Sequence, residues 1–216
     1  MEREKGSDAQ RVSKGLFQAW GVREVVTAVL MNVLILVLMF AGSSVTMLHP
    51  HLAMLASGGA AVFLGAAVFM LMVFRVNRFG VTTLFATMAA LMFCTMGNYA
   101  IMIPFYIAGG LVLDLVFLRS EEQRRSIRWV TAAWSTFSGL YLLSTMIPVI
   151  SNLDAYIDNF IRNFGSDQAF IDAFLRYYTD PLWVFGIAIA TVICGFAGCL
   201  AARVLMRKHF SKAGAL

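Results

Sequence analysis

Charged side chains are scarce in this sequence. Only 13% of its 216 residues are Asp, Glu, Lys or Arg, whereas 60% are hydrophobic. A soluble domain is about 25% charged, so this composition argues against a soluble protein. Proline and histidine are also rare, with four and three residues, and they leave long hydrophobic runs uninterrupted. The composition therefore predicts an integral membrane protein.

Several catalytic motifs are missing from the sequence. It contains no GxxxxGK[ST] phosphate-binding loop, which excludes ATP hydrolysis by the P-loop route, and no HExxH zinc motif. The EEQRR run, Glu121 to Arg125, resembles an intramembrane protease motif only loosely, and a solvated loop of mixed charge explains it better. We therefore expect a protein that is not an enzyme.

Hydrophobic runs long enough to cross a lipid bilayer recur six times. A membrane helix needs about 20 mostly apolar residues, and the lack of period-two alternation argues against barrel strands. The sequence predicts an all-α integral membrane protein, with a six-transmembrane-helix bundle over residues 25–206. The predicted spans are Val25–Val45, Leu52–Phe74, Val81–Met96, Tyr99–Leu118, Trp129–Ile150 and Leu182–Met206.

Positive charge is concentrated on one side of the predicted bundle. If both termini share a side, 15 of the 17 Lys and Arg residues lie there, in the arm of residues 1–24, in two loops, in the tail of residues 207–216 and at Arg203 just before that tail. Only Arg162 and Arg176 lie opposite. Because Lys- and Arg-rich loops stay in the cytoplasm, we expect both termini to be cytoplasmic. This bias also explains the net charge of +5 without a nucleic-acid partner.

Residues 151–180, the lid segment, connect the last two predicted spans on the outer face. Apolar residues from Leu153 to Phe164 recur at i, i+3, i+4, i+7, i+8 and i+11, as in an amphipathic helix. A second stripe ends at Tyr178. The pattern predicts two short amphipathic helices joined near Gly165. They either cover a cavity between the spans or only lie on the bilayer surface.

Two of the three histidines flank Pro50, in the short turn between the first two spans on the side of the lid segment. We expect a small-molecule ligand to bind on this side of the bundle. The alternative is that the histidines only end one helix and begin the next. The candidate binding residues are His49, His51, Asn98, Tyr99, Tyr156, Phe160, Arg162, Phe174, Arg176 and Tyr177.

Asp114 is the one acidic residue inside the predicted spans, and it lies near their cytoplasmic ends, close to Arg119. Pairing with that arginine or snorkelling to the interface would explain it. A proton-driven carrier needs ionisable relays near the membrane midplane. Their absence argues against a self-sufficient permease.

Four stretches carry a resemblance to a known family. They read RVNRFGVTTLFATMAALMF, YIAGGLVLDLVF, DAYIDNF and DPLWVFGIAIATVICGFAGCLAARVLMRKHFSKAGAL. From about Val25 to the C-terminus, the chain resembles the substrate-binding S component of an energy-coupling factor (ECF) transporter, an ABC-type importer. More narrowly, it is similar to the Trep_Strep group. The tail RKHFSKAGAL is the most specific stretch.

The resemblance implies a transport subunit of the bacterial cytoplasmic membrane. S components capture a small nutrient at the outer face and deliver it inward with a transmembrane coupling subunit and two cytoplasmic ATPase subunits. Family members dock the coupling subunit through an A-x-x-x-A pattern on the first helix. Here Ala28 fits the first position and Asn32 replaces the second alanine. The alternative for Asn32 is a hydrogen bond between helices inside the bundle.

Haem uptake is associated with some similar proteins, so the resemblance implies haem or a related tetrapyrrole as a candidate transported ligand and no intrinsic cofactor. His49 or His51 would ligate the iron, and Arg162 and Arg176 would pair with the propionates. A bare metal ion is not expected, since two histidines without a nearby carboxylate or thiolate are an incomplete ligand set. A self-sufficient permease and an integral membrane enzyme or assembly factor are the alternatives.

Overall fold

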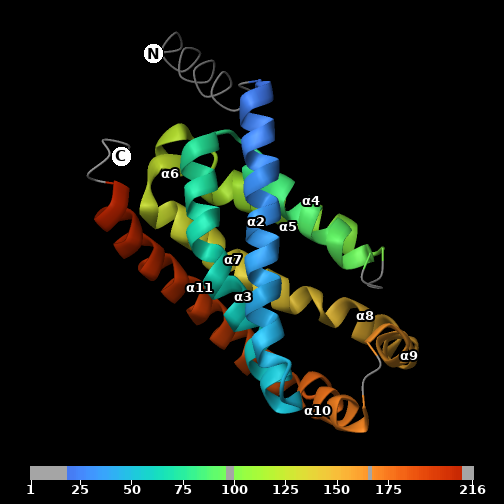
Figure 1. Cartoon of the computed structure of the whole chain (residues 1–216). Coiled ribbons are helices and arrows are strands. Elements are labelled where there is room, and N and C mark those ends of the chain that lie inside the picture. Colours follow the sequence, from blue (N-terminus) through green and yellow to red (C-terminus); the bar gives the residue numbers. More distant parts are fainter. Residues whose placement is uncertain (1–18, 96–99, 165–166, 211–216) are drawn as a thin grey trace, which may run out of the picture.

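The computed structural model describes residues 19–95, 100–164 and 167–210, and every regular element in these ranges is a helix. This confirms the all-α prediction. Figure 1 shows α9 and α10 at the end of the bundle opposite the start of α2. The helices are α2 (Val22–Thr46), α3 (Pro50–Val76), α4 (Val81–Thr95), α5 (Met102–Phe117), α6 (Glu121–Arg125), α7 (Ile127–Ser144), α8 (Met146–Ser151), α9 (Leu153–Phe164), α10 (Gln168–Tyr178) and α11 (Pro181–Phe210).

Four helical segments in the described ranges are long and apolar enough to cross a membrane. They are α2, α3, the consecutive α7 and α8, and α11. The predicted third and fourth spans are the shorter helices α4 and α5, of 15 and 16 residues. At 1.5 Å per residue each is about 22 to 24 Å long, against about 30 Å for the hydrocarbon core. The structure therefore supports a membrane bundle with four long apolar helices, while α4 and α5 pack against each other as a shorter pair.

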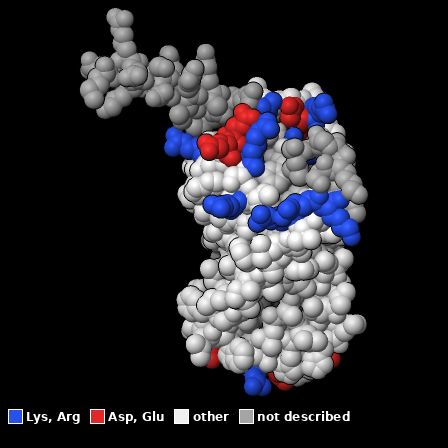
Figure 2. All heavy atoms as spheres, turned by 90° about the vertical axis from the view of Figure 1, so that its left-hand side faces the viewer, with Lys and Arg blue, Asp and Glu red and all other residues white. Residues whose placement is uncertain are grey.

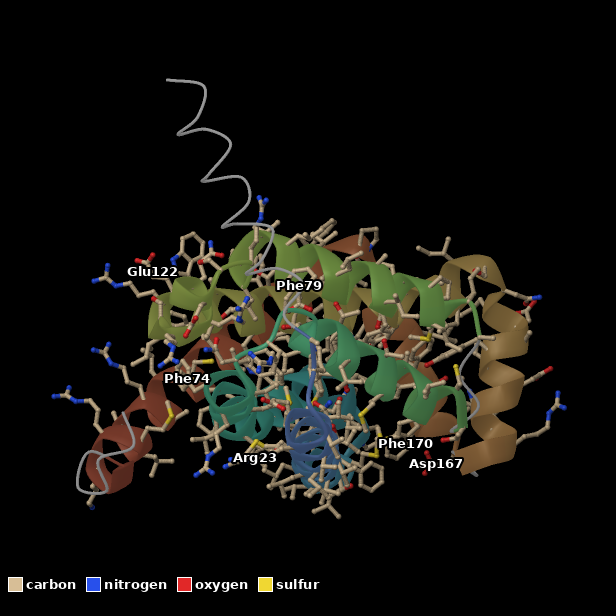
Figure 3. The ribbon with its side chains drawn as sticks, turned by 90° about the horizontal axis from the view of Figure 1, so that it is seen from above. Arg23, Phe74, Phe79, Glu122, Asp167 and Phe170 are labelled. Carbon is tan, nitrogen blue, oxygen red and sulfur yellow. The ribbon has the colours of Figure 1, made fainter. Side chains whose placement is uncertain are left out.

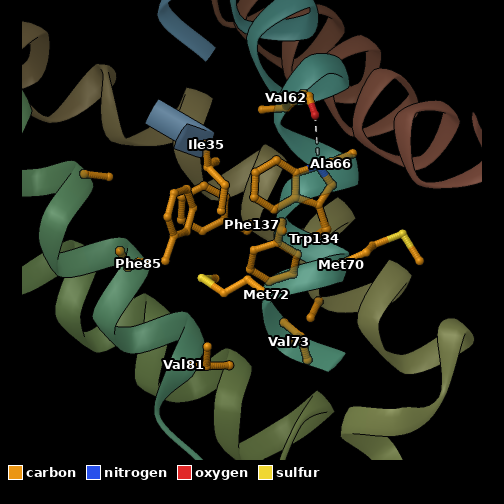
Figure 4. Close-up of a cluster of buried hydrophobic side chains, with 14 of the residues drawn as sticks. Ile35, Val62, Ala66, Met70, Met72, Val73, Val81, Phe85, Trp134 and Phe137 are labelled. Carbon is orange, nitrogen blue, oxygen red and sulfur yellow. Dashed lines mark hydrogen bonds between the residues drawn. The ribbon is translucent and has the colours of Figure 1, made fainter. Parts of the chain in front are cut away.

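An aromatic cluster fills the middle of the bundle and joins α3, α4 and α7 (Figure 4). Trp134 lies at its centre, and its indole Nε1 donates to the Val62 carbonyl at 3.0 Å. The rings of Phe69, Phe85 and Phe137 lie 4.5, 5.7 and 5.6 Å from the Trp134 ring. The buried indole N–H is satisfied in this way, so the interior is packed rather than hollow here.

Small residues bring two neighbouring helices close to α3. A Cβ atom added at Gly198 of α11 would lie 2.6 Å from the Phe63 carbonyl oxygen, and one at Gly42 of α2 would lie 2.7 Å from the Ala60 oxygen. Both distances are too short for any side chain. Glycine at these two positions therefore permits the close backbone approach on which helix packing in lipid relies.

The two ends of the bundle differ in charge. The basic end contains the start of α2, the end of α3, α6 and the end of α11. The histidine end contains the turn with His49 and His51, together with α9 and α10. On the face drawn in Figure 2, charged side chains gather toward the basic end, an apolar band follows, and few charges lie at the other end.

The EEQRR run forms α6, and one of its residues is not solvated as the sequence suggests. Arg124 is only 2% exposed. Its Nη1 donates to the carbonyls of Leu118 and Arg119 at 2.9 and 2.8 Å, and its Nε donates to Asn77 Oδ1 at 3.1 Å. Burial lowers the pKa of Arg124, and the nearby Glu121 carboxylate opposes that shift. Arg124 therefore links the C-terminal end of α5 to the C-terminal end of α3 by hydrogen bonds.

Candidate substrate site at the histidine end

The histidine turn begins α3. His49 occupies the N-cap position with an extended backbone, and Pro50 is the first helical residue, where its fixed φ is favourable. The rings of His49 and His51 are 5.4 Å apart, and both residues are exposed. Both histidines therefore lie at the start of α3, and neither ends the preceding helix, because α2 ends at Thr46.

One of the two histidines also contacts the lid segment. The Tyr177 hydroxyl of α10 lies 3.2 Å from Nδ1 of His51, within hydrogen-bonding distance, and the two rings meet edge to face at 5.8 Å. Next to it, the Tyr178 hydroxyl donates to the Met54 carbonyl of α3 at 3.1 Å. Burial raises the pKa of Tyr178, so that this hydroxyl remains a donor. Two consecutive tyrosines thus connect α10 to the first turns of α3.

The helix α10 is packed into the bundle by its apolar face. Ala173, Phe174 and Tyr177 are buried there, and Asp167 accepts a hydrogen bond from the Phe170 amide as the N-cap. The buried cluster beneath α10 contains side chains of α3, α7 and α11, namely Ala53, Met54, Leu142, Ile187 and Ala188. This packing favours a cover over the end of the bundle rather than a helix that only lies on the bilayer surface.

The helix α9 joins the site through aromatic contacts. The Tyr156 ring lies 5.3 Å from Phe174, and Phe174 stacks on Tyr178 at 5.1 Å. None of the described side chains of α9 is buried. Asn152 caps the helix, because its Oδ1 accepts from the Ala155 amide at 3.0 Å. Both helices predicted in the lid segment are present, and α10 is the more firmly packed.

The predicted cations lie at the surface of this end. Arg176 is exposed, and its guanidinium carbon is 5.6 Å from the centre of the Tyr177 ring. Arg162 is exposed on α9. Asn98 and Tyr99 lie outside the described residues, and Phe160 lies on α9 with its side chain outside the described part.

Six of the predicted residues make ring, hydrogen-bond or cation–π contacts at this end, namely His49, His51, Tyr156, Phe174, Arg176 and Tyr177. Sequence reasoning missed Trp183, whose ring meets Tyr177 at 4.9 Å, and the Met54 carbonyl. Trp183 lies in the first turn of α11, directly after the lid segment, but the sequence does not show which way its side chain points around that helix. In the described residues, no group of three or more His, Cys, Asp or Glu could hold a metal ion.

The two predicted docking residues point into the bundle. Ala28 and Asn32 are both 0% exposed on α2. The Asn32 amide donates to Met88 Sδ of α4 at 3.4 Å, which is the hydrogen bond between helices that the sequence left as an alternative. In the described part of the chain, no group bonds to its Oδ1. The exposed side of α2 is formed by other residues, including Val25, Val29 and Val33.

Asp114 neither pairs with Arg119 nor snorkels to the interface. The side chain is fully buried, and its carboxylate caps the start of α4. Oδ1 accepts from the Thr82 amide at 3.2 Å, while Oδ2 accepts from the Thr83 amide at 2.8 Å and its hydroxyl at 2.7 Å. These are the amides that a helix start leaves unpaired. Asp114 is therefore a structural cap supplied by a neighbouring helix.

Comparison with protein families finds a match over most of the chain. A family model described as a hypothetical bacterial integral membrane protein (Trep_Strep) matches residues 22–212. No curated protein and no solved structure is significantly similar to the chain.

Proposed function

Because the chain belongs to the Trep_Strep family of bacterial integral membrane proteins, we propose that this multi-pass membrane protein is the substrate-binding S component of an ECF-type importer. In this proposal the basic end faces the cytoplasm and the histidine end faces outward in the cytoplasmic membrane. The protein captures a small nutrient, and a coupling subunit with two ATPases supplies the energy.

The observation that carries the proposal is the attachment of α10 to the histidine turn. An amphipathic helix covers one end of an apolar bundle, and two tyrosine hydroxyls, of Tyr177 and Tyr178, connect it to α3. A cover of this kind suits a site that must close over its ligand. The engaged carboxylate of Asp114 also leaves no free acidic relay at that position, which favours an externally powered subunit over a proton-driven permease.

Ligand entry requires α10 to move, because Phe174 and Tyr177 fill the space beneath it. Each hydrogen bond that connects α10 to α3 contributes only about 0.5–1.5 kcal/mol net. Moving α10 away from α3 therefore costs less free energy than unfolding a long helix of the bundle. In this proposal the described arrangement is the closed state of the site.

Transport in reconstituted vesicles tests the proposal. The chain alone in proteoliposomes should bind the nutrient without accumulating it. Accumulation should appear when a coupling subunit and two ATPases are added with ATP, and it should require hydrolysis. Uptake by the chain alone would instead indicate a self-sufficient permease.

We propose haem or a related tetrapyrrole as the substrate. Imidazoles of His49 and His51, a Phe and Tyr surface, and the exposed Arg176 together suit an iron, a flat apolar ring and a propionate. Haemin added to the purified protein should give a Soret band that shifts in His49→Ala and His51→Ala. The matched control is Asp158→Ala, an exposed change on α9. Identical spectra in both single variants and the double variant would exclude these two ligands.

A further inference from the structure

A cavity opens at the basic end, between the start of α2 and the end of α3. Its volume is about 290 Å³, and it is lined by Arg23, Glu24, Thr27 and Arg75. A water molecule occupies about 30 Å³ in the liquid, so the cavity has room for a ligand of several heavy atoms. Figure 3 looks down on this end of the molecule and labels Arg23 at the start of α2.

The charges in this cavity do not cancel. The Glu24 carboxylate pairs with Arg78, which is not part of the lining, and Arg78 Nη2 lies 3.1 Å from Glu24 Oε1. Arg23 and Arg75 form no ion pair with any other residue that the structure describes. The negative charge is therefore engaged elsewhere, and two guanidinium groups remain available for an anion.

The fourth lining residue of the cavity, Thr27, is a hydrogen-bond donor. Thr27 lies one turn after Arg23 on the same side of α2, and nothing in the described part of the chain bonds to its hydroxyl. The Glu24 carboxylate already accepts hydrogen bonds from backbone amides at the start of α2, so the donors left for a ligand are the two guanidinium groups and the Thr27 hydroxyl. Arginine forks match phosphate oxygens in bidentate geometry. The whole set of donors suits a phosphate group.

We propose that this cavity binds a phosphate group, as carried by the headgroup of an anionic phospholipid. The exposed apolar surface of α2 begins immediately beyond the cavity, with Val25, Val26 and Val29. A headgroup in the cavity would therefore place its acyl chains along that surface. Basic pockets between membrane helices near the cytoplasmic surface recognise lipid headgroups in this way. The bound lipid would hold the start of α2 at the bilayer surface.

Native mass spectrometry of the full chain tests the site with phosphatidylglycerol and phosphatidylcholine as probes. Phosphatidylglycerol should remain bound and phosphatidylcholine should not. The variant Arg23→Gln with Arg75→Gln should bind phosphatidylglycerol more than tenfold more weakly, at about fivefold for each arginine. Exchanging both arginines for lysine keeps the charge and should retain part of the binding.

The matched control is Arg128→Gln with Arg203→Gln, which removes two exposed arginines outside the cavity and should change the affinity by less than twofold. Displacement of the lipid by millimolar inorganic phosphate would identify the free anion as the ligand of the same site. Equal losses in the cavity variant and the control, or no loss in either while circular dichroism shows folded protein, would overturn the proposal.

Discussion

Single polar side chains hold helix ends in place in this bundle. Asp114 caps α4 from α5, and Arg124 occupies the end of α5 from α6. Water is scarce at these positions, so each unpaired backbone group would carry its full desolvation cost. Buried charge in this protein therefore serves the helix termini, and it does not mark an ion pathway at the two positions.

Replacing Asp114 should destabilise the protein. Asp114→Ala leaves the amides of Thr82 and Thr83 without an acceptor, and we expect a loss of about 1–3 kcal/mol in unfolding free energy. Asp114→Asn keeps a carbonyl oxygen and should lose less. Thermal unfolding in detergent measures both, with Asp158→Ala on the exposed side of α9 as control. Equal stability of all three variants would show that the cap contributes nothing.

The Tyr177 hydroxyl should affect local opening more than global stability. Tyr177→Phe keeps the ring in its packed position and removes only the bond to His51. We expect α10 amides to exchange with deuterium about two- to tenfold faster, which corresponds to about 0.5–1.5 kcal/mol. Amides in α7 should be unaffected. A uniform increase over the whole chain would contradict a role confined to the lid segment.

At the scale of the helices, close backbone approach determines which faces meet. The same helix α11 contains glycines in two different environments. A Cβ added at Gly198 would meet the Phe63 carbonyl oxygen, whereas one at Gly186 meets nothing within 4 Å. Replacing glycine by alanine therefore adds a methyl group to α11 either at a packed position, Gly198, or at an open one, Gly186.

We expect Gly198→Ala to lower the unfolding free energy by about 1–3 kcal/mol, because α11 must move away from α3. Gly186→Ala should be neutral or stabilising by up to about 1 kcal/mol, since alanine favours the helix. Thermal unfolding in detergent compares the two variants. If both changed stability in the same direction by the same amount, helix propensity rather than packing would be the cause.

At the scale of the whole molecule, the charge difference between the ends predicts how the chain crosses the membrane. The basic end should face the cytoplasm, because Lys and Arg resist translocation. In a background with Cys94, Cys194 and Cys199 replaced, Asp154→Cys should react with a membrane-impermeant maleimide on intact cells. Glu122→Cys, on α6, should react only after lysis. The reverse labelling pattern would invert the orientation and move the histidine end to the cytoplasm.

Local and compositional features were predictable from the amino-acid sequence. The membrane class follows from hydropathy, the two helices of the lid segment follow from 3.6-residue periodicity, and the Asn152 cap follows from its position before an apolar stripe. Each of these depends on residues within a few turns of one another. The lengths of α4 and α5 were harder to predict, since an apolar run does not reveal where its helix ends.

Contacts between distant residues were decided only in the folded bundle. His51 and Tyr177 are 126 residues apart, and Asp114 is 31 residues from Thr83. Asn32, which the family resemblance predicts at a docking surface, is buried. In lipid, hydrophobicity does not distinguish the inner face of a helix from its outer face. The rotation of each helix, and therefore the partners of every polar side chain, comes from close packing with its neighbours.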